Sequence, residues 1–349
     1  MPPNRYKEAH ASPNGPGDSR PTALQIITDE KLHNALGDKV LVLTGATSGI
    51  GLETARALAA TGARLFLTVR DLNKAKANNA LSEIITENPD RIELVEMDNA
   101  SLESVRRGAD EILAASRGQV NVLIANAAVM GIKELELSKD GYEMHFATNY
   151  LGHFMLFQLL KPALLASASR EFNSRVVVVS SSAQRVGNLA GGPNGTLFGY
   201  DYNFTEPEAP YVFSTAYANS KLASVYMANE IERRYASRNL HATSLHPGAI
   251  DTNISRHLGR GFVEAFYANE AVVRIIKSVE QGAATTVLAA VGREWEGRGG
   301  VYLEDCAEAQ RGAEDGNPLG TGYVERTYDE VLEGKLWGMG VRLLGVDDD

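Results

Sequence analysis

The sequence predicts an α/β fold in which helices cover both faces of one doubly wound parallel sheet. From Lys39 onward, short aliphatic runs alternate with longer amphipathic stretches, a pattern typical of parallel strands buried on both faces. The first run leads directly into a glycine-rich turn and a helical pattern, as in the first βα unit of such folds. No second domain is indicated after the last run, so we expect residues 23–349 to form a single domain.

Each element is predicted from its own pattern. A short helix is expected in "ALQIITDEKLHNAL", where apolar residues recur at helical spacing. A further helix is expected around 279–291, and one more closes the chain. The runs predicted as strands are KVLVLT, RLFLTV, IELVEM, VNVLIAN, RVVVVSS, HATSLH and GVYLED.

Composition narrows the class of protein. With 44% apolar residues, the chain of 349 residues can bury a large core, and its net charge of -10 argues against nucleic acid or an anionic membrane as a partner. The single cysteine, Cys306, cannot form an internal disulfide, which suits the reducing cytoplasm. Because the sequence has neither a signal-peptide core nor a long apolar run, we expect a cytoplasmic protein without a membrane anchor. Residues 1–22 are rich in proline, glycine and polar residues and are predicted to be disordered.

The segment "TGATSGIG", residues 44–51, has the pattern of a turn that holds a dinucleotide. Gly45, Gly49 and Gly51 allow the backbone to turn tightly and to approach a pyrophosphate, which then lies at the positive end of the following helix. Their spacing is Gly-x-x-x-Gly-x-Gly and not the more widespread Gly-x-Gly-x-x-Gly. A glycine-rich turn can also be purely structural, but the strand before it and the helix after it favour dinucleotide binding.

The end of the second strand is the usual place for the residue that contacts the adenosine ribose. An acidic residue there accepts hydrogen bonds from a free 2′-hydroxyl, whereas "TVRD" places Arg70 at this point, and a cation favours the 2′-phosphate of NADP. Alternatively, Arg70 is a solvated charge and Asp71 contacts the ribose. Asp98, at the end of the third strand, can accept from the adenine amino group or cap the helix that starts near Ser101.

The stretch "STAYANSKLA" places Tyr217 and Lys221 four residues apart among small side chains. In a helix this spacing puts the phenol and the ammonium on one face. A tyrosine and a lysine at helical spacing are also common on protein surfaces, so the pair gains its weight from the ordered motifs around it.

Together, these motifs resemble the short-chain dehydrogenases/reductases, a family with a Rossmann-type fold that combines a Thr-Gly-x-x-x-Gly-x-Gly turn with a Tyr-x-x-x-Lys helix. The resemblance runs in order from Lys39 to about Gly345. It is carried by TGATSGIG, ANAA at 125–128, NYLGHF at 149–154, VVVVSS, YANSK and HPGAIDT at 246–252. The YANSKLA helix, GGVYLEDC and the closing GKLWGMGVRLLG are most similar to the branch that contains the retinol dehydrogenases and the WW-domain-containing oxidoreductase.

The resemblance implies roles for the matching residues. Tyr217 exchanges a proton with the reacting oxygen, while Lys221 lowers the pKa of this phenol, about 10 when free, and contacts the nicotinamide ribose. Ser181 holds the reacting oxygen, and the carbonyl of Asn149 kinks its helix and holds a water linked to the lysine. The implied cofactor-binding residues are Gly45, Thr47, Ser48, Gly49, Ile50, Gly51, Arg70, Asp98, Asn126, Ala127, Tyr217, Lys221, Pro247, Gly248, Ile250 and Thr252.

The sequence departs from the family pattern at Ala128, where the family has glycine. We expect the added methyl to adjust cofactor affinity, because glycine is favoured where backbone runs close to a ribose. His153 is expected to pack in the interior and His246 to end a strand. Neither histidine has a partner at metal-ligand spacing, so no metal site is predicted.

Two loops are expected to line the substrate pocket. The segment 187–213, between Ser181 and Tyr217, carries aromatic residues among glycines and prolines, and these either wall the pocket or anchor an insertion. The segment 253–275 is expected to be the opposite wall. The resemblance also implies that helices over 139–168 and 215–238 pair two subunits in a homodimer. The aromatic residues of the first loop are Phe198, Tyr200, Tyr202, Phe204, Tyr211 and Phe213.

The predicted function is hydride transfer between NADP(H), favoured over NAD(H), and a carbonyl or alcohol group of an apolar small molecule such as a secondary-metabolite intermediate. Two alternatives stay open. One is a regulatory protein that binds the dinucleotide without turnover. The other is a relative of the sugar-nucleotide epimerases and dehydratases, which share the fold and the Tyr-x-x-x-Lys pair but differ in glycine spacing and have a larger C-terminal substrate domain.

Overall fold

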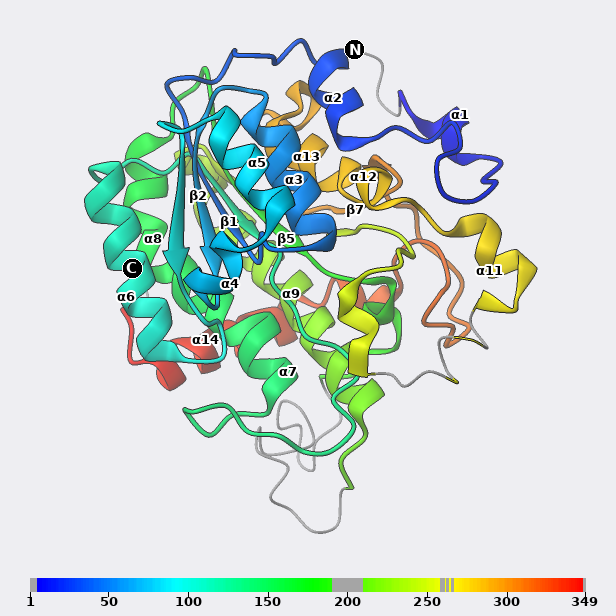
Figure 1. The fold of residues 1–349 in the computed structure, drawn as a ribbon. Helices are drawn as coiled ribbons and strands as arrows, with labels where there is room; N and C mark the ends of the chain where they lie inside the picture. The colour runs from blue at the N-terminus through cyan, green and yellow to red at the C-terminus, as the bar shows by residue number, and fades with distance from the viewer. Residues whose placement is uncertain (1–4, 190–209, 258–260, 262–263, 265–266, 348–349) are drawn as a thin grey trace.

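The computed structural model describes residues 5–189, 210–257, 261, 264 and 267–347. Within these residues, eight strands form one sheet in the order β3-β2-β1-β4-β5-β6-β7-β8 (Figure 1). Strands β1 to β7 pair in parallel, and β8 pairs antiparallel with β7, so the predicted doubly wound parallel sheet is confirmed. The strands are β1 (Val40–Thr44), β2 (Arg64–Val69), β3 (Ile92–Glu96), β4 (Val122–Ala125), β5 (Ser174–Val179), β6 (Leu240–His246), β7 (Tyr302–Glu304) and β8 (Ala307–Glu308).

The sheet separates two hydrophobic cores, because alternate side chains of each strand point to opposite faces. In β1, Val40 and Val42 belong to one core, while Leu41 and Leu43 belong to the other. All residues of β1 are buried. This explains why the strand is a continuous aliphatic run and not an alternation of apolar and polar residues.

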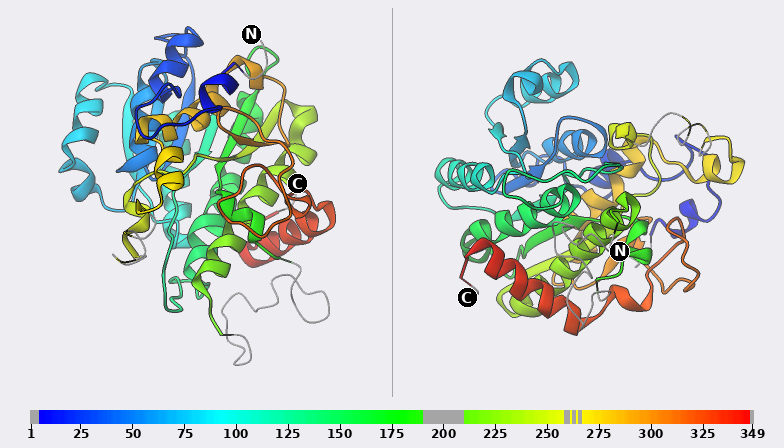
Figure 2. Two further views of the ribbon diagram at one scale, coloured as in Figure 1. Left: turned by 90° about the vertical axis from the view of Figure 1, so that its right-hand side faces the viewer. Right: turned by 90° about the horizontal axis from the view of Figure 1, so that it is seen from below.

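Helices cover both faces of the sheet (Figures 1 and 2). The helices that contribute to the core of Leu41 and Leu43 are α2 (Ala23–Asp29), α3 (Gly49–Ala59), α4 (Leu72–Lys76), α5 (Asn79–Glu87) and α13 (Ala284–Val291). Those of the opposite core are α6 (Leu102–Ser116), α7 (Met144–Phe146), α8 (Gly152–Ser167), α9 (Phe213–Tyr235) and α14 (Glu330–Leu344). The short helices α1 (Lys7–His10), α11 (Glu270–Ile275) and α12 (Val279–Gly282) complete the described set, and α12 with α13 replaces the single helix expected over 279–291.

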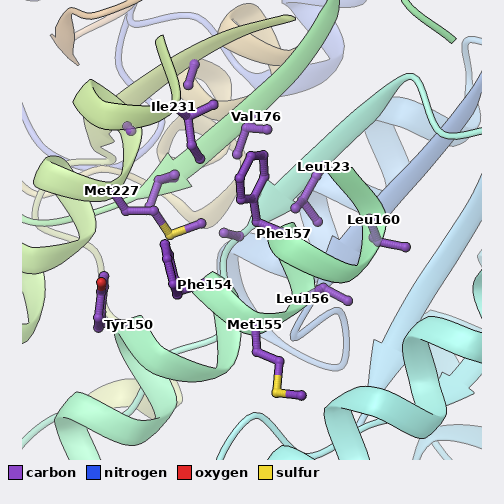
Figure 3. Close-up of a cluster of buried hydrophobic side chains, with 14 of the residues drawn as sticks. Leu123, Tyr150, Phe154, Met155, Leu156, Phe157, Leu160, Val176, Met227 and Ile231 are labelled. Atoms are coloured by element: carbon purple, nitrogen blue, oxygen red, sulfur yellow. The ribbon is translucent and has the colours of Figure 1, made fainter. Parts of the chain in front are cut away.

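The core under α8 and α9 is rich in aromatic side chains. Figure 3 shows Phe154 and Phe157 of α8 meeting Met227 and Ile231 of α9. Trp337 of α14 packs edge-on against Phe154, at 4.9 Å between ring centroids. The C-terminal helix therefore covers part of the surface through which we expected two subunits to pair.

The N-terminal segment differs from the prediction of disorder for residues 1–22. Residues 5–22 lie on the domain, beside α12 in Figure 1, and Tyr6 and Arg20 are buried. The Arg20 guanidinium donates to the carbonyls of Ile275 and Ile276, at 2.8 and 2.6 Å. Proline, glycine and polar residues give little hydrophobic signal, but here backbone hydrogen bonds to a neighbouring segment hold the chain.

Candidate active site

The glycine-rich turn joins the end of β1 to α3. Gly45 and Gly49 have positive φ angles of 72° and 55°, a conformation that side chains strongly disfavour. A Cβ atom at Gly51 would lie 2.2 Å from the carbonyl oxygen of Gly45 and 2.7 Å from Nδ2 of Asn126. The three glycines are thus needed for different reasons. Gly45 and Gly49 adopt the backbone conformation of the turn, and Gly51 lets the first turn of α3 pack closely against the backbone of Gly45.

Gly51→Ala is therefore expected to lower both the melting temperature and the affinity for a dinucleotide, because the methyl must displace the turn or α3. Overpacking of this kind costs about 1–3 kcal/mol of stability. Thermal unfolding and a fluorescence titration with NADPH measure the two effects. Gly338→Ala in α14 is the matched control, since its added Cβ meets nothing closer than 3.5 Å. An unchanged NADPH affinity in Gly51→Ala would contradict the close-packing argument.

A hydrogen-bond network connects this turn to α8. The Thr44 hydroxyl accepts from the backbone N–H groups of Asn126 and Ala127, both at 2.9 Å, and contacts Nε2 of His153 at 2.8 Å. Nδ1 of His153 donates to the carbonyl of Asn149 at 3.0 Å, which makes Nε2 an acceptor for the Thr44 hydroxyl. Burial lowers the pKa of His153 to about 4, so the ring is neutral and acts as a structural bridge, in agreement with the expected packing role.

Tyr217 and Lys221 are held against the end of β5. The Lys221 ammonium donates to the carbonyl of Val179 at 2.9 Å and lies 5.9 Å from the centre of the Tyr217 ring. Ser180 donates to the backbone carbonyl of Lys221 at 2.7 Å, which fastens α9 to the strand. Ser181, the next residue, interacts with the Tyr217 phenol through a side-chain hydrogen bond. The predicted serine, tyrosine and lysine therefore lie together.

The pKa values of Tyr217 and Lys221 do not follow the expectation that Lys221 lowers the pKa of Tyr217. Burial raises the pKa of Tyr217 to about 12, and the hydrogen bond with Ser181 only partly opposes this effect. Burial also lowers the pKa of Lys221 to about 7, so the lysine is only partly charged near neutrality. A partly neutral amine has only a weak effect on the pKa of a neighbouring phenol. Without a bound cofactor, burial is therefore the main influence on the protonation of both groups.

Asn149 lies in a π-helical turn, Ala147–Leu151, that interrupts the helix before α8. Its side-chain amide accepts from the N–H of Val129 at 2.9 Å and donates to the hydroxyl of Ser220 at 2.9 Å. Ser220 in turn donates to the carbonyl of Tyr217 at 2.7 Å. Among the described residues, Asn149 is the one predicted catalytic residue that does not line the cavity, and it acts on the site through α9.

All of the predicted cofactor-binding residues line one cavity of about 1630 Å³ at the carboxyl edge of the sheet, together with Ser181. Asp98 accepts from the N–H of Ala100 at 3.0 Å, while Ser101 is the N-cap of α6, so the suggested cap role of Asp98 is wrong. Asp71 caps α4 through the N–H of Lys74 at 3.0 Å and pairs with the Lys74 ammonium at 3.4 Å.

The aromatic loop is described only at its ends. Phe213 lines the cavity, whereas the hydroxyl of Tyr211 contacts the carbonyl of Ile132 and a carboxylate oxygen of Glu143, at 3.0 and 3.1 Å. Phe213 is thus part of the cavity wall, whereas Tyr211 anchors the end of the loop to the rest of the domain. The remaining ones, Phe198, Tyr200, Tyr202 and Phe204, lie outside the described residues. Of the segment 253–275, Ile254, Arg256 and Ile275 also line the cavity.

Sequence reasoning missed a buried cluster beneath Tyr217. Nδ1 of His145 contacts the Glu143 carboxylate at 2.6 Å, and the His145 ring packs edge-on against the Tyr217 ring at 6.0 Å. The carboxylate also binds Tyr211, two residues before α9 begins. The cluster thereby positions the first turns of the helix that carries Tyr217. Glu143 and Tyr211 are far apart in the chain, and no local pattern indicates that they meet.

A phenol and an ammonium at the carboxyl edge of a parallel sheet, next to a turn shaped for a pyrophosphate, suit a nicotinamide-dependent oxidoreductase that uses tyrosine as its proton donor. Comparison with known proteins agrees. A family model described as short chain dehydrogenase matches residues 39–193. The chain belongs to the short-chain dehydrogenase/reductase family, and it is an enzyme of that class.

The curated relatives also confirm the expected branch. Short-chain dehydrogenase/reductase prx1 of Penicillium roqueforti is 44% identical over 344 residues, which cover 99% of this chain and 96% of that protein. The WW domain-containing oxidoreductase of Pongo abelii is 37% identical over 339 residues, covering 94% and 72%. The polyprenol dehydrogenase of Mus musculus is 37% identical over 310 residues, covering 88% and 84%. In the part of the chain that is described, the helices lack the length and apolar composition needed to cross a membrane.

Proposed function

We propose that this enzyme transfers a hydride between NADP(H) and a carbonyl or alcohol group of an apolar small molecule. The observation that carries the proposal is the meeting of Ser181, Tyr217 and Lys221 in the cavity that the glycine-rich turn also lines. The cavity fits the cofactor at Gly49, where a Cβ would lie 3.1 Å from Cγ2 of Thr252 and narrow the cavity that both residues line. Gly49 begins α3, and the N-terminus of a helix binds a pyrophosphate.

When bound, the nicotinamide supplies or accepts the hydride. Ser181 and Tyr217 hold the reacting oxygen of the substrate, and the Tyr217 phenol gives this oxygen a proton in reduction. With a pKa of about 12, the phenol keeps its proton at neutral pH. The chain by itself therefore favours the acid role of Tyr217, which is the role needed to reduce a carbonyl.

Lys221 binds the nicotinamide ribose hydroxyls and supplies positive charge beside the phenol. Its backbone and side chain are fixed by Ser180 and Val179, so the ammonium is already oriented. Asn149 and Ser220 hold the helical turn between Tyr217 and Lys221 and are positioning residues for this pair.

Preference for NADP(H) rests on the charges at the end of β2. Arg70 is exposed at the cavity edge. Burial, and to a lesser extent the positive charge of Arg70, lowers the pKa of Arg256, which lines the same cavity. Asp71 is engaged as the cap of α4 and as the partner of Lys74. Two guanidinium groups suit a 2′-phosphate, whereas the carboxylate that could bind a free ribose hydroxyl is already in use.

Arg70→Ala is expected to reduce the preference for NADPH over NADH in kcat/KM from about tenfold or more toward unity. Charge-assisted hydrogen bonds contribute about 1.5–3 kcal/mol, and exposure of Arg70 favours the lower half of this range. Both cofactors are assayed at several salt concentrations. Arg256→Ala tests the second guanidinium, and Arg298→Ala, away from the cavity, is the control. A wild-type preference for NADH would contradict the assignment.

The substrate end of the cavity is lined by apolar side chains, including Met130, Met144, Val186, Phe213 and Leu319. They favour an apolar substrate, as does the similarity to the polyprenol dehydrogenase. Consumption of NADPH is measured against a panel of apolar aldehydes and ketones. Reduction of panel members supports the proposal, whereas tight NADPH binding without turnover of any carbonyl would favour a regulatory dinucleotide-binding protein.

A further inference from the structure

The N-terminal segment builds one wall of the cavity. Gly17 donates to Oε1 of Gln281 at 3.0 Å, and Nε2 of Gln281 donates back to the carbonyl of Arg20 at 3.0 Å. Arg20 in turn binds the carbonyls at the end of α11. These contacts hold residues 5–22 against the segment that follows the predicted substrate loop. As a result, His10, Pro13 and Arg20 line the same cavity as Tyr217.

His10 presents a hydrogen-bond acceptor there. Nδ1 contacts the carbonyl of Tyr6 at 2.9 Å, and because a carbonyl only accepts, this nitrogen carries the proton. Burial lowers the pKa of His10, so Nε2 is a neutral acceptor at physiological pH. It faces Oδ1 of Asp305, a second acceptor, at 3.8 Å, and only 7% of the His10 side chain is exposed.

Asp305 and Lys277 complete this group. The Lys277 ammonium pairs with Oδ1 of Asp305 at 2.7 Å and also donates to the carbonyl of Pro247 at 3.3 Å. Both side chains line the cavity. The site therefore offers the His10 Nε2 acceptor beside a carboxylate and an ammonium that are paired with each other. A hydroxyl group fits this arrangement, since it donates one hydrogen bond and accepts others.

His10, Asp305 and Lys277 are connected through His246 to the part of the cavity that holds Ser181. His246, at the end of β6, accepts from the N–H of Ser182 at 3.2 Å, and Ser182 follows Ser181 directly. Burial lowers the pKa of His246 to about 4, the charge of Lys277 adds to this effect, and the charge of Asp305 opposes it. His246 thus contacts the turn that follows Ser181, and Pro247, the next residue, accepts from Lys277.

We propose that His10, Asp305 and Lys277 form a second polar subsite, which binds a hydroxyl group of the substrate remote from its reacting carbon. This inference rests on the proposed function, because it assumes that the substrate occupies the cavity beyond the nicotinamide. It assigns to the N-terminal segment a part in substrate selection: the enzyme prefers an apolar molecule that carries a second hydroxyl.

The test compares binding of straight-chain primary alcohols and the α,ω-diols of equal length, over a series of lengths. Affinities are measured by calorimetry with NADPH present, so that the alcohols bind without being oxidised. At one or more lengths the diol is expected to bind about tenfold more tightly than its alcohol, as for one hydrogen bond to a charged group. His10→Phe should abolish this difference, while His10→Gln, whose amide oxygen can replace Nε2, should retain it.

His33→Phe is the matched control, because His33 is exposed and lies outside the cavity. The proposal is overturned if no diol binds more tightly than its alcohol, or if His10→Phe retains the full difference. NADPH consumption with the corresponding aldehydes is measured in parallel. Turnover of simple aldehydes without a diol preference rejects the subsite but keeps the proposed function, whereas a diol preference without turnover supports the subsite and rejects the proposed reaction.

Discussion

Tyr217→Phe is expected to lower kcat for carbonyl reduction by about a thousandfold while leaving NADPH affinity nearly unchanged. A positioned general acid contributes roughly 10²–10⁴ in rate. The phenol, which is hydrogen-bonded to Ser181, is the proton donor of the proposed mechanism. The ring itself remains, so its edge-on packing against His145 is retained. Steady-state kinetics give kcat, and a fluorescence titration gives the dissociation constant of NADPH.

Tyr323→Phe serves as the control, since this tyrosine packs against Tyr328 and does not line the cavity. It should retain wild-type kcat. Activity of Tyr217→Phe within tenfold of wild type would show that another group protonates the reacting oxygen. A large loss of NADPH affinity would instead mean that the phenol hydroxyl contributes mainly to cofactor binding.

Lys221→Met is expected to reduce kcat by about a hundredfold or more and to weaken NADPH binding by about tenfold, because one ammonium serves both the phenol and the ribose. Methionine keeps the apolar stem of lysine, which separates the loss of charge from the loss of packing. Lys161→Met is the control, since Lys161 is also buried but lies outside the cavity. An unchanged NADPH dissociation constant would remove the ribose-binding role of Lys221.

Lys221→Met should affect the stability of the protein differently from its activity. Burial lowers the pKa of Lys221 to about 7, whereas the unfolded chain has a pKa near 10.4. Between these values the unfolded state binds more protons, so this lysine costs stability at neutral pH and the cost disappears as the pH rises toward 10. The melting temperature of Lys221→Met at pH 7 is thus expected to stay equal to that of wild type or exceed it. A fall confined to neutral pH would contradict the low pKa.

The sequence by itself determined the parallel strands, the glycine-rich turn and the Tyr-x-x-x-Lys pair, because these depend on local patterns. It did not indicate the two-residue antiparallel strand β8. Buried parallel strands must be aliphatic on both faces, and Tyr217 and Lys221 share a helix face wherever the helix packs. Gly51 was recognisable for the same reason, since a tight turn between a strand and a helix leaves no space for a Cβ.

Only the tertiary structure decided which distant residues meet. Glu143 and Tyr211, and likewise His10 and Asp305, come from segments with no shared pattern, and their contacts arise where loops converge at the carboxyl edge of the sheet. The N-terminal segment is held in place because Arg20 binds the carbonyl groups of Ile275 and Ile276. The composition of the segment cannot predict these contacts. The pKa values of Tyr217 and Lys221 likewise depend on burial, and burial is a property of the whole fold.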